Sequence, residues 1–141
     1  MTSDRQRLRR VRLIERLRSS EHRQAAAEAH RAELVRQKLE KLSERTRSLA
    51  QLYALRDGAR DGADLRGATL LSAHMNELGR TAEQQASQAR DAADERLAEL
   101  AIADRKRRRA EDNRRDVHRA IIDRLAKPDS TPARRTGTEL E

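Results

Sequence analysis

The chain has 141 residues, of which 40% are charged and 35% hydrophobic, and it carries a formal net charge of +8 but only one aromatic residue, Tyr53. Aromatic side chains supply much of the buried area of compact cores, so this composition excludes a thick multilayer core and favours long helices with a narrow apolar stripe. The absence of cysteine excludes a disulfide framework and a thiolate metal site.

The first predicted helix covers residues 4 to about 56, because no glycine precedes Gly58 and no proline precedes Pro128. Its second half repeats apolar or small residues at steps of three and four, the heptad spacing of a coiled-coil seam. Its first half has another stripe, and the alanine-rich residues 25–29 between the two predict a change of phase. The expected stripes are Leu8, Val11, Ile14 and Leu17, followed by Ala32, Val35, Leu39, Leu42, Thr46, Leu49 and Tyr53.

A break is predicted at residues 57–66, where the sequence is rich in glycine and aspartate. A second helix follows over about 67–126 and ends before Pro128, since proline disfavours helix at the preceding residue. The remaining tail, 128–141, is expected to be disordered. The second seam is predicted at Leu71, Met75, Leu78 and Ala82, and after a weak Ala/Gln stretch at Ala93, Leu97, Leu100, Ala103, Ala110, Val117, Ile121 and Leu125.

Two long helices with one short break predict an all-α fold, a long antiparallel two-helix coiled-coil hairpin that forms a single domain over residues 1–127. In this arrangement residue i lies opposite about residue 122 minus i, plus or minus a few residues, counted from the centre of the break. A single chain that dimerises as a parallel coiled coil is the alternative. The glycine and aspartate cluster favours the hairpin.

Positive charge is concentrated in two segments that this pairing brings together. Residues 5–18 contain seven arginines and one acid, and residues 105–124 contain nine lysines or arginines and four acids, which gives a joint net charge of +11. Exposed coiled-coil faces usually mix both signs. The pattern therefore favours an acidic or phosphate-bearing partner, although a merely solvated end remains an alternative.

No catalytic, cofactor-binding or metal-binding constellation is recognisable in the sequence. None of the four histidines has a second histidine four residues away, and the glycines of the break lack the GK[ST] ending of a phosphate loop. A two-helix structure also offers no pocket that excludes water. We therefore expect a non-enzyme without cofactor, metal or small-molecule substrate.

The chain resembles the FliJ family, the small coiled-coil component of the flagellar type III protein export apparatus, to which stalk proteins of virulence secretion systems are related. The similar stretches are ATLLSAHMNELGRTAEQQASQARDAADERLAEL (68–100) and LAELAIADRKRRRAEDNRRD (97–116). The aromatic residues that often follow the break in the family are absent from this chain.

The resemblance implies a cytoplasmic stalk, peripherally associated with the inner-membrane export apparatus. Its paired ends would promote assembly and activity of the export ATPase ring, and the region after the break would contact the export gate, with export chaperones as further partners. The implied ATPase-binding residues are Arg9, Arg10, Arg12, Arg16, Arg107, Arg108, Arg109, Arg114 and Arg115. The implied gate-binding residues are Leu71, His74, Met75, Leu78 and Gln85, of which Leu71, Met75 and Leu78 could instead pack in the seam.

Two other functions remain open at this point. A homodimeric coiled-coil spacer would require only the heptad periodicity of the apolar residues. A helical nucleic-acid-binding protein would explain the basic segments. Nucleic acid is the less favoured partner, because no aromatic residues stand among the arginines to stack on bases.

Overall fold

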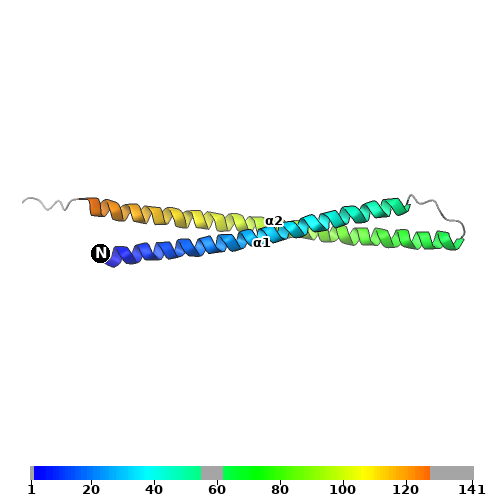
Figure 1. The fold of residues 1–141 in the computed structure, drawn as a ribbon, viewed down its shortest axis with the longest axis horizontal. Coiled ribbons are helices and arrows are strands. Elements are labelled where there is room, and N and C mark those ends of the chain that lie inside the picture. Colours follow the sequence, from blue (N-terminus) through cyan, green and yellow to red (C-terminus); the bar gives the residue numbers. More distant parts are fainter. Residues whose placement is uncertain (1, 55–61, 128–141) are drawn as a thin grey trace, which may run out of the picture. The chain divides into compact units, whose positions relative to one another are not determined.

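The computed structural model describes residues 2–54 and 62–127, which form two helices (Figure 1). Helix α1 covers Thr2–Ala54 and helix α2 covers Gly62–Ala126. The helices run antiparallel, since Asp4 pairs with Arg124 near one end of each and Arg47 pairs with Glu83 near the other. The predicted all-α antiparallel helical hairpin is confirmed, and the described residues contain no strand.

The second helix begins earlier than predicted. Residues 62–66, which the sequence assigned to the break, are helical, so that part of the prediction is wrong. Neither Gly62 nor Gly67 has a positive φ, and Asp64 lies in the first turn, where a carboxylate stabilises the helix dipole. The rest of the predicted break, 57–61, and the predicted disordered tail, 128–141, lie outside the described residues.

The chain divides into two compact units. One comprises residues 1–20 and 105–141, and the other comprises residues 21–104. We call the first the basic unit and the second the neutral unit, for the charges given below. Each unit is an antiparallel pair made of one stretch of α1 and one stretch of α2.

The seam consists of the residues of each helix that face the other. On α1 it follows one uninterrupted alternation of three- and four-residue steps, and on α2 the alternation is broken once, between Ala93 and Leu100, where Arg96 is exposed. In the neutral unit it includes Ala29, Ala32 and Leu39 of α1, and the change of phase predicted at residues 25–29 does not occur. The buried and half-buried positions that form the seam of this unit are His22, Ala25, Ala29, Ala32, Arg36, Leu39, Ser43, Thr46, Ala50 and Tyr53 on α1, and Ser72, Met75, Gly79, Ala82, Ala86, Ala89, Ala93, Leu100 and Ala103 on α2.

Six of the fifteen seam residues predicted in this unit are wrong. Ala32, Leu39, Thr46 and Tyr53 are seam residues as predicted, but the intervening positions are Arg36, Ser43 and Ala50. The six residues that were predicted in the seam but lie beside it remain 41–53% exposed: Val35, Leu42, Leu49, Leu71, Leu78 and Leu97.

Small residues explain this choice of seam. Ala82, Ala86, Ala89 and Ala93 of α2 are 2–8% exposed, so the Ala/Gln stretch that was predicted to be weak contains four of the buried residues of the described chain. Small side chains let two helices approach closely, and bulky leucines in the same layers would hold them apart. The helices therefore pack their small faces together and leave the larger ones beside the seam.

The seam of the basic unit is partly polar. Leu8, Val11, Ala110, Val117 and Ile121 are buried or half-buried, as predicted. Three residues predicted in this seam are instead exposed, namely Ile14 (45%), Leu17 (55%) and Leu125 (67%). Their places are taken by half-buried charged residues, which include Asp4, Glu15, Arg18, Arg107 and Arg114.

The register of the hairpin is shifted from the prediction. The residue numbers of the ion pairs that cross between the helices, from Asp4–Arg124 to Arg47–Glu83, sum to between 124 and 130 instead of about 122. With this register, residues 62–71 of α2 have no part of α1 opposite them and are exposed. They extend past the end of α1 (Figure 1).

Gly79 offers a simple way to stabilise the neutral unit. It is half-buried in the seam, and a Cβ built on it would meet only Thr46 Cγ2, at 4.0 Å, an ordinary van der Waals distance. Glycine inside a helix costs about 0.5–1 kcal/mol relative to alanine. We expect Gly79→Ala to raise the free energy of unfolding by about that amount, measured by thermal or urea denaturation. A lower stability would show that the helices approach more closely here than described.

Candidate functional site: an arginine-rich helix pair

All of the excess positive charge belongs to the basic unit. Its residues, 1–20 and 105–141, contain 19 lysines or arginines and 9 acids, a net charge of +10. The neutral unit contains 13 lysines or arginines and 15 acids, a net charge of −2. The division into units thus coincides with the change in charge, and it singles out the basic unit as the candidate site for an anionic partner.

A stripe of unpaired arginines runs along α1 in this unit. Arg5, Arg9, Arg12 and Arg16 follow one another at steps of four, three and four, which places them on one face of the helix. Within the described part of the chain none of the four forms a hydrogen bond or ion pair. Together with Leu8 and Leu13 they line a shallow groove of about 450 Å³. We call these four residues the arginine stripe.

The arginines of α2 are largely used within the protein. Arg114 Nε lies 2.6 Å from Glu15 Oε2 of α1, and this ion pair crosses the seam. Arg107 and Arg115 both contact Glu111, at 3.3 and 2.6 Å. These three of the predicted ATPase-binding residues therefore have structural partners that an external partner would have to replace.

The remaining predicted residues divide between the two helices. Arg9, Arg10, Arg12 and Arg16 are exposed on α1. Arg108 and Arg109 are exposed on α2. Of the predicted residues outside the ion pairs above, four are therefore on α1 and two on α2, although the densest basic run in the sequence is on α2.

Two further basic residues contribute to the surface and were missed by the sequence interpretation. Arg5 belongs to the arginine stripe, and its spacing of four from Arg9 was a signal that could have revealed it. Arg119 lies with Arg114, Arg115, His118 and Ile122 around a second shallow groove of about 260 Å³ on α2.

The chemistry available to this surface is binding. An exposed guanidinium offers up to five N–H donors in a planar fork that matches carboxylates and phosphates. A row of such groups on a rigid helix can hold several anionic groups of a partner at once. The lining residues of both grooves include no carboxylate that could act as a general base.

The predicted gate-binding residues lie in the neutral unit and do not form one surface. Leu71, His74, Leu78 and Gln85 are exposed, and Leu71, Leu78 and Gln85 share one side of α2 because they are seven residues apart. Met75 is half-buried in the seam. Met75 therefore packs against α1, and the other four are accessible.

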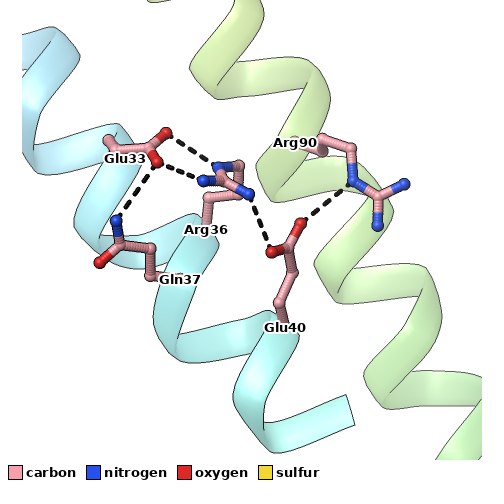
Figure 2. Close-up of polar contacts among 5 residues, drawn as sticks. All are labelled: Glu33, Arg36, Gln37, Glu40 and Arg90. Carbon is pink, nitrogen blue, oxygen red and sulfur yellow. Dashed lines mark hydrogen bonds and ion pairs between the residues drawn. The ribbon is translucent and has the colours of Figure 1, made fainter. Parts of the chain in front are cut away.

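The neutral unit also contains an ion-paired network, which Figure 2 shows. Glu40 of α1 accepts hydrogen bonds from Arg36 Nη1 at 2.8 Å and from Arg90 Nε of α2 at 3.2 Å, while Arg36 also pairs with Glu33. The hydrogen bonds from Arg36 hold the pKa of Glu33 below its ordinary value. The carboxylates of Glu33 and Glu40 in turn raise the pKa of Arg36 above its ordinary value. Because these positive and negative charges pair with one another, the network stabilises the pairing of α1 with α2 rather than the binding of an external anion.

Further searches of the described residues give no other class of site. No group of three or more histidine, aspartate or glutamate side chains is arranged to hold a metal ion in residues 2–54 and 62–127. Within the same residues, neither helix contains a segment long and apolar enough to cross a bilayer. No family model matches the sequence, and no curated protein or solved structure is significantly similar to it.

Proposed function

We propose that this chain is a non-enzymatic docking protein whose basic unit binds an acidic protein surface, and that its partner is the ATPase ring of a flagellar-type protein export apparatus. The arginine stripe is the observation that carries the proposal. It presents four guanidinium groups on one face of a long helix, without internal partners among the described residues. The FliJ-like sequence stretches supply the identity of the partner.

The organisation of the chain is compatible with a stalk. The beginning of α1 and the end of α2 pack together in the basic unit, where Arg124 Nη1 lies 2.9 Å from Asp4 Oδ1. A helix pair of this kind can enter a ring pore that is lined by acidic groups. Charge attraction then steers the docking and fixes its register more than it adds affinity.

The second function of the stalk is contact with the export gate. We assign it to exposed residues of α2 in the neutral unit. Leu71, His74, Leu78 and Gln85 are accessible for this contact. Met75 supports it indirectly by fixing α2 on α1. In this proposal the chain acts in the cytoplasm, associates with the inner membrane only through its partners, and is also open to contact by export chaperones.

A titration of ATP hydrolysis tests the proposal. The full chain is added to the export ATPase from the same source at about 150 mM salt, where exposed charges are screened as in the cell. We expect stimulation that saturates near one basic unit per ATPase ring. An unchanged rate over the whole titration would reject the ATPase as the partner.

Nucleic acid is the second candidate, and the same unpaired guanidiniums favour it, because phosphates and carboxylates satisfy them equally well. Binding of a duplex can be measured at the same salt concentration. Tight binding with a steep dependence on salt, together with no effect on ATP hydrolysis, would assign the basic unit to phosphate binding.

A further inference from the structure

The arginine stripe lies on one side of the helix pair in the basic unit. Its four residues directly follow the seam residues Asp4, Leu8, Val11 and Glu15. Successive residues of an α-helix are rotated by about 100°, so every residue that directly follows a seam residue projects from the same flank of the seam. A residue that directly precedes a seam residue projects from the opposite flank. Ile14, which precedes Glu15, therefore lies on the other side.

Ion pairs show how the flanks of two antiparallel helices correspond. Glu40 of α1 and Arg90 of α2, which Figure 2 shows joined, each directly follow a seam residue. The same holds for Arg47 and Glu83. Since side chains on these flanks reach each other, the flank that follows the seam on one helix and the flank that follows it on the other face one side of the pair.

By this rule the shallow groove on α2 of the basic unit opens on the same side as the arginine stripe. Three of its lining residues directly follow a seam residue, namely Arg115, His118 and Ile122. The ion pairs Asp4–Arg124 and Glu15–Arg114 have residue numbers that sum to 128 and 129, so residues 115–122 lie opposite about residues 6–14. The two grooves therefore form one surface. We call the arginine stripe together with Arg115, His118 and Ile122 the basic face.

The basic face offers a partner positive charge that carboxylates of the chain do not offset. Among the described residues of the basic unit, the one carboxylate that directly follows a seam residue is Glu111. Both of its oxygens are already in use, since Oε2 lies 3.3 Å from Arg107 Nη1 and Oε1 lies 2.6 Å from Arg115 Nη2. On the opposite flank the exposed Asp116 directly precedes Val117. Charge complementarity therefore favours an anionic partner on the basic face.

Apolar side chains accompany the cations of the basic face. Leu8 and Leu13 line the groove on α1 together with the stripe, and Leu13 is 53% exposed. Ile122, in the groove on α2, is 49% exposed. A phosphate backbone would satisfy the guanidinium groups but would give these side chains no apolar contact. The face thus favours a protein partner that presents carboxylates and aliphatic side chains together.

We propose that the basic face binds an acidic amphipathic helix of the partner protein, which lies along α1 and α2 as the third helix of a bundle. The stripe extends from Arg5 to Arg16, about 16 Å or three helical turns. A helix laid along it repeats its side chains at the same steps of three and four residues, so successive carboxylates can meet successive arginines. This inference rests on the docking function proposed above and specifies the element of the partner that docks.

A synthetic peptide serves as the probe for the partner helix. It has about 18 residues, because shorter isolated helices are marginal in water, with leucines at steps of three and four and glutamates on both sides of that leucine stripe. We expect it to bind the full chain in a one-to-one complex at about 150 mM salt, measured by titration calorimetry. A peptide of the same composition in scrambled order should bind at least about tenfold more weakly. Equal affinities of the two peptides would overturn the proposal, because negative charge alone would then suffice.

Two matched double variants of the full chain locate the binding surface. His118→Glu with Ile122→Glu alters the basic face and should weaken binding of the peptide at least about tenfold, because carboxylates then face carboxylates. Ile14→Glu with Asn113→Glu introduces the same charge on the opposite flank, since both residues directly precede a seam residue, and should change the affinity less than about threefold. All four positions are exposed, so helicity by circular dichroism should remain unchanged. An equal loss of affinity in both variants would contradict the proposal.

The rate of ATP hydrolysis distinguishes this inference from the proposed function. If the unaltered chain stimulates the export ATPase and both double variants stimulate it equally, the docking function stands and the basic face is the wrong surface. If the unaltered chain leaves the rate unchanged but binds the peptide through the basic face, the ATPase is the wrong partner and the helix-binding surface stands. Tight binding of a DNA duplex together with no binding of the peptide would assign both grooves to phosphate and overturn the inference.

Discussion

Replacing Arg9, Arg12 and Arg16 by glutamate is expected to abolish stimulation of the export ATPase. Binding to the ATPase should weaken at least about a hundredfold, because the loss of each charge contact in an interface costs a few kcal/mol of binding free energy. The three residues are exposed and have no partners in the described part of the chain. Glutamate forms helix as readily as arginine, so α1 should stay intact. The rate of ATP hydrolysis, the dissociation constant and the helicity are measured on the same preparations.

The matched control changes the net charge by the same amount elsewhere. Arg23, Lys41 and Arg80 of the neutral unit are exposed and likewise unpaired among the described residues, and their replacement by glutamate should leave stimulation nearly unchanged. Equal losses in both triple variants would show that overall charge, rather than the arginine stripe, controls binding. That outcome would remove the basis for assigning the site.

The dense run of arginines on α2 is a less informative target. Reversing Arg107, Arg108 and Arg109 would break the contact of Arg107 with Glu111 and place a carboxylate in the seam, where the side chain of Arg107 is only 30% exposed. A loss of stimulation would then combine lost docking with lost pairing of the helices. The stripe on α1 separates the two effects.

The existence of the helix pair was predictable from the sequence, and the facing residues were predictable only in part. Ala32, Leu39, Thr46 and Tyr53 belong to both possible alternations of three and four residues. Hydrophobicity favoured the alternation that includes Leu42 and Leu49. Close packing of alanines favoured the alternation that includes Ser43 and Ala50, and the spacing within one helix contains no information about how closely the other helix approaches.

The difference between the predicted and the observed register also affected the predicted site residues. With the predicted register Glu15 lies opposite Arg107, whereas in the structure it pairs with Arg114, one heptad further along α2. The sequence therefore predicted a basic unit correctly by counting charges. It could not predict which arginines are neutralised internally, because that depends on the overhang of residues 62–71.

The alanine seam makes a stability prediction of its own. Ala93 is 2% exposed, and its replacement by aspartate would place a short, charged side chain in a layer with no room for water. Burial of an unpaired carboxylate at this position should lower the free energy of unfolding by about 2–4 kcal/mol. A decrease in the melting temperature of roughly 10 °C is expected, measured by circular dichroism.

Ala98→Asp provides the control for this variant. Ala98 is exposed on the same helix, so the substitution has the same helix propensity cost and the same charge change without burial. The substitution should lower the free energy of unfolding by less than about 1 kcal/mol, since substitutions at exposed positions have small effects. If the two aspartates destabilise the chain equally, Ala93 is not packed in a seam. The leucines at positions 42, 49 and 78 would then be the residues that hold the helices together.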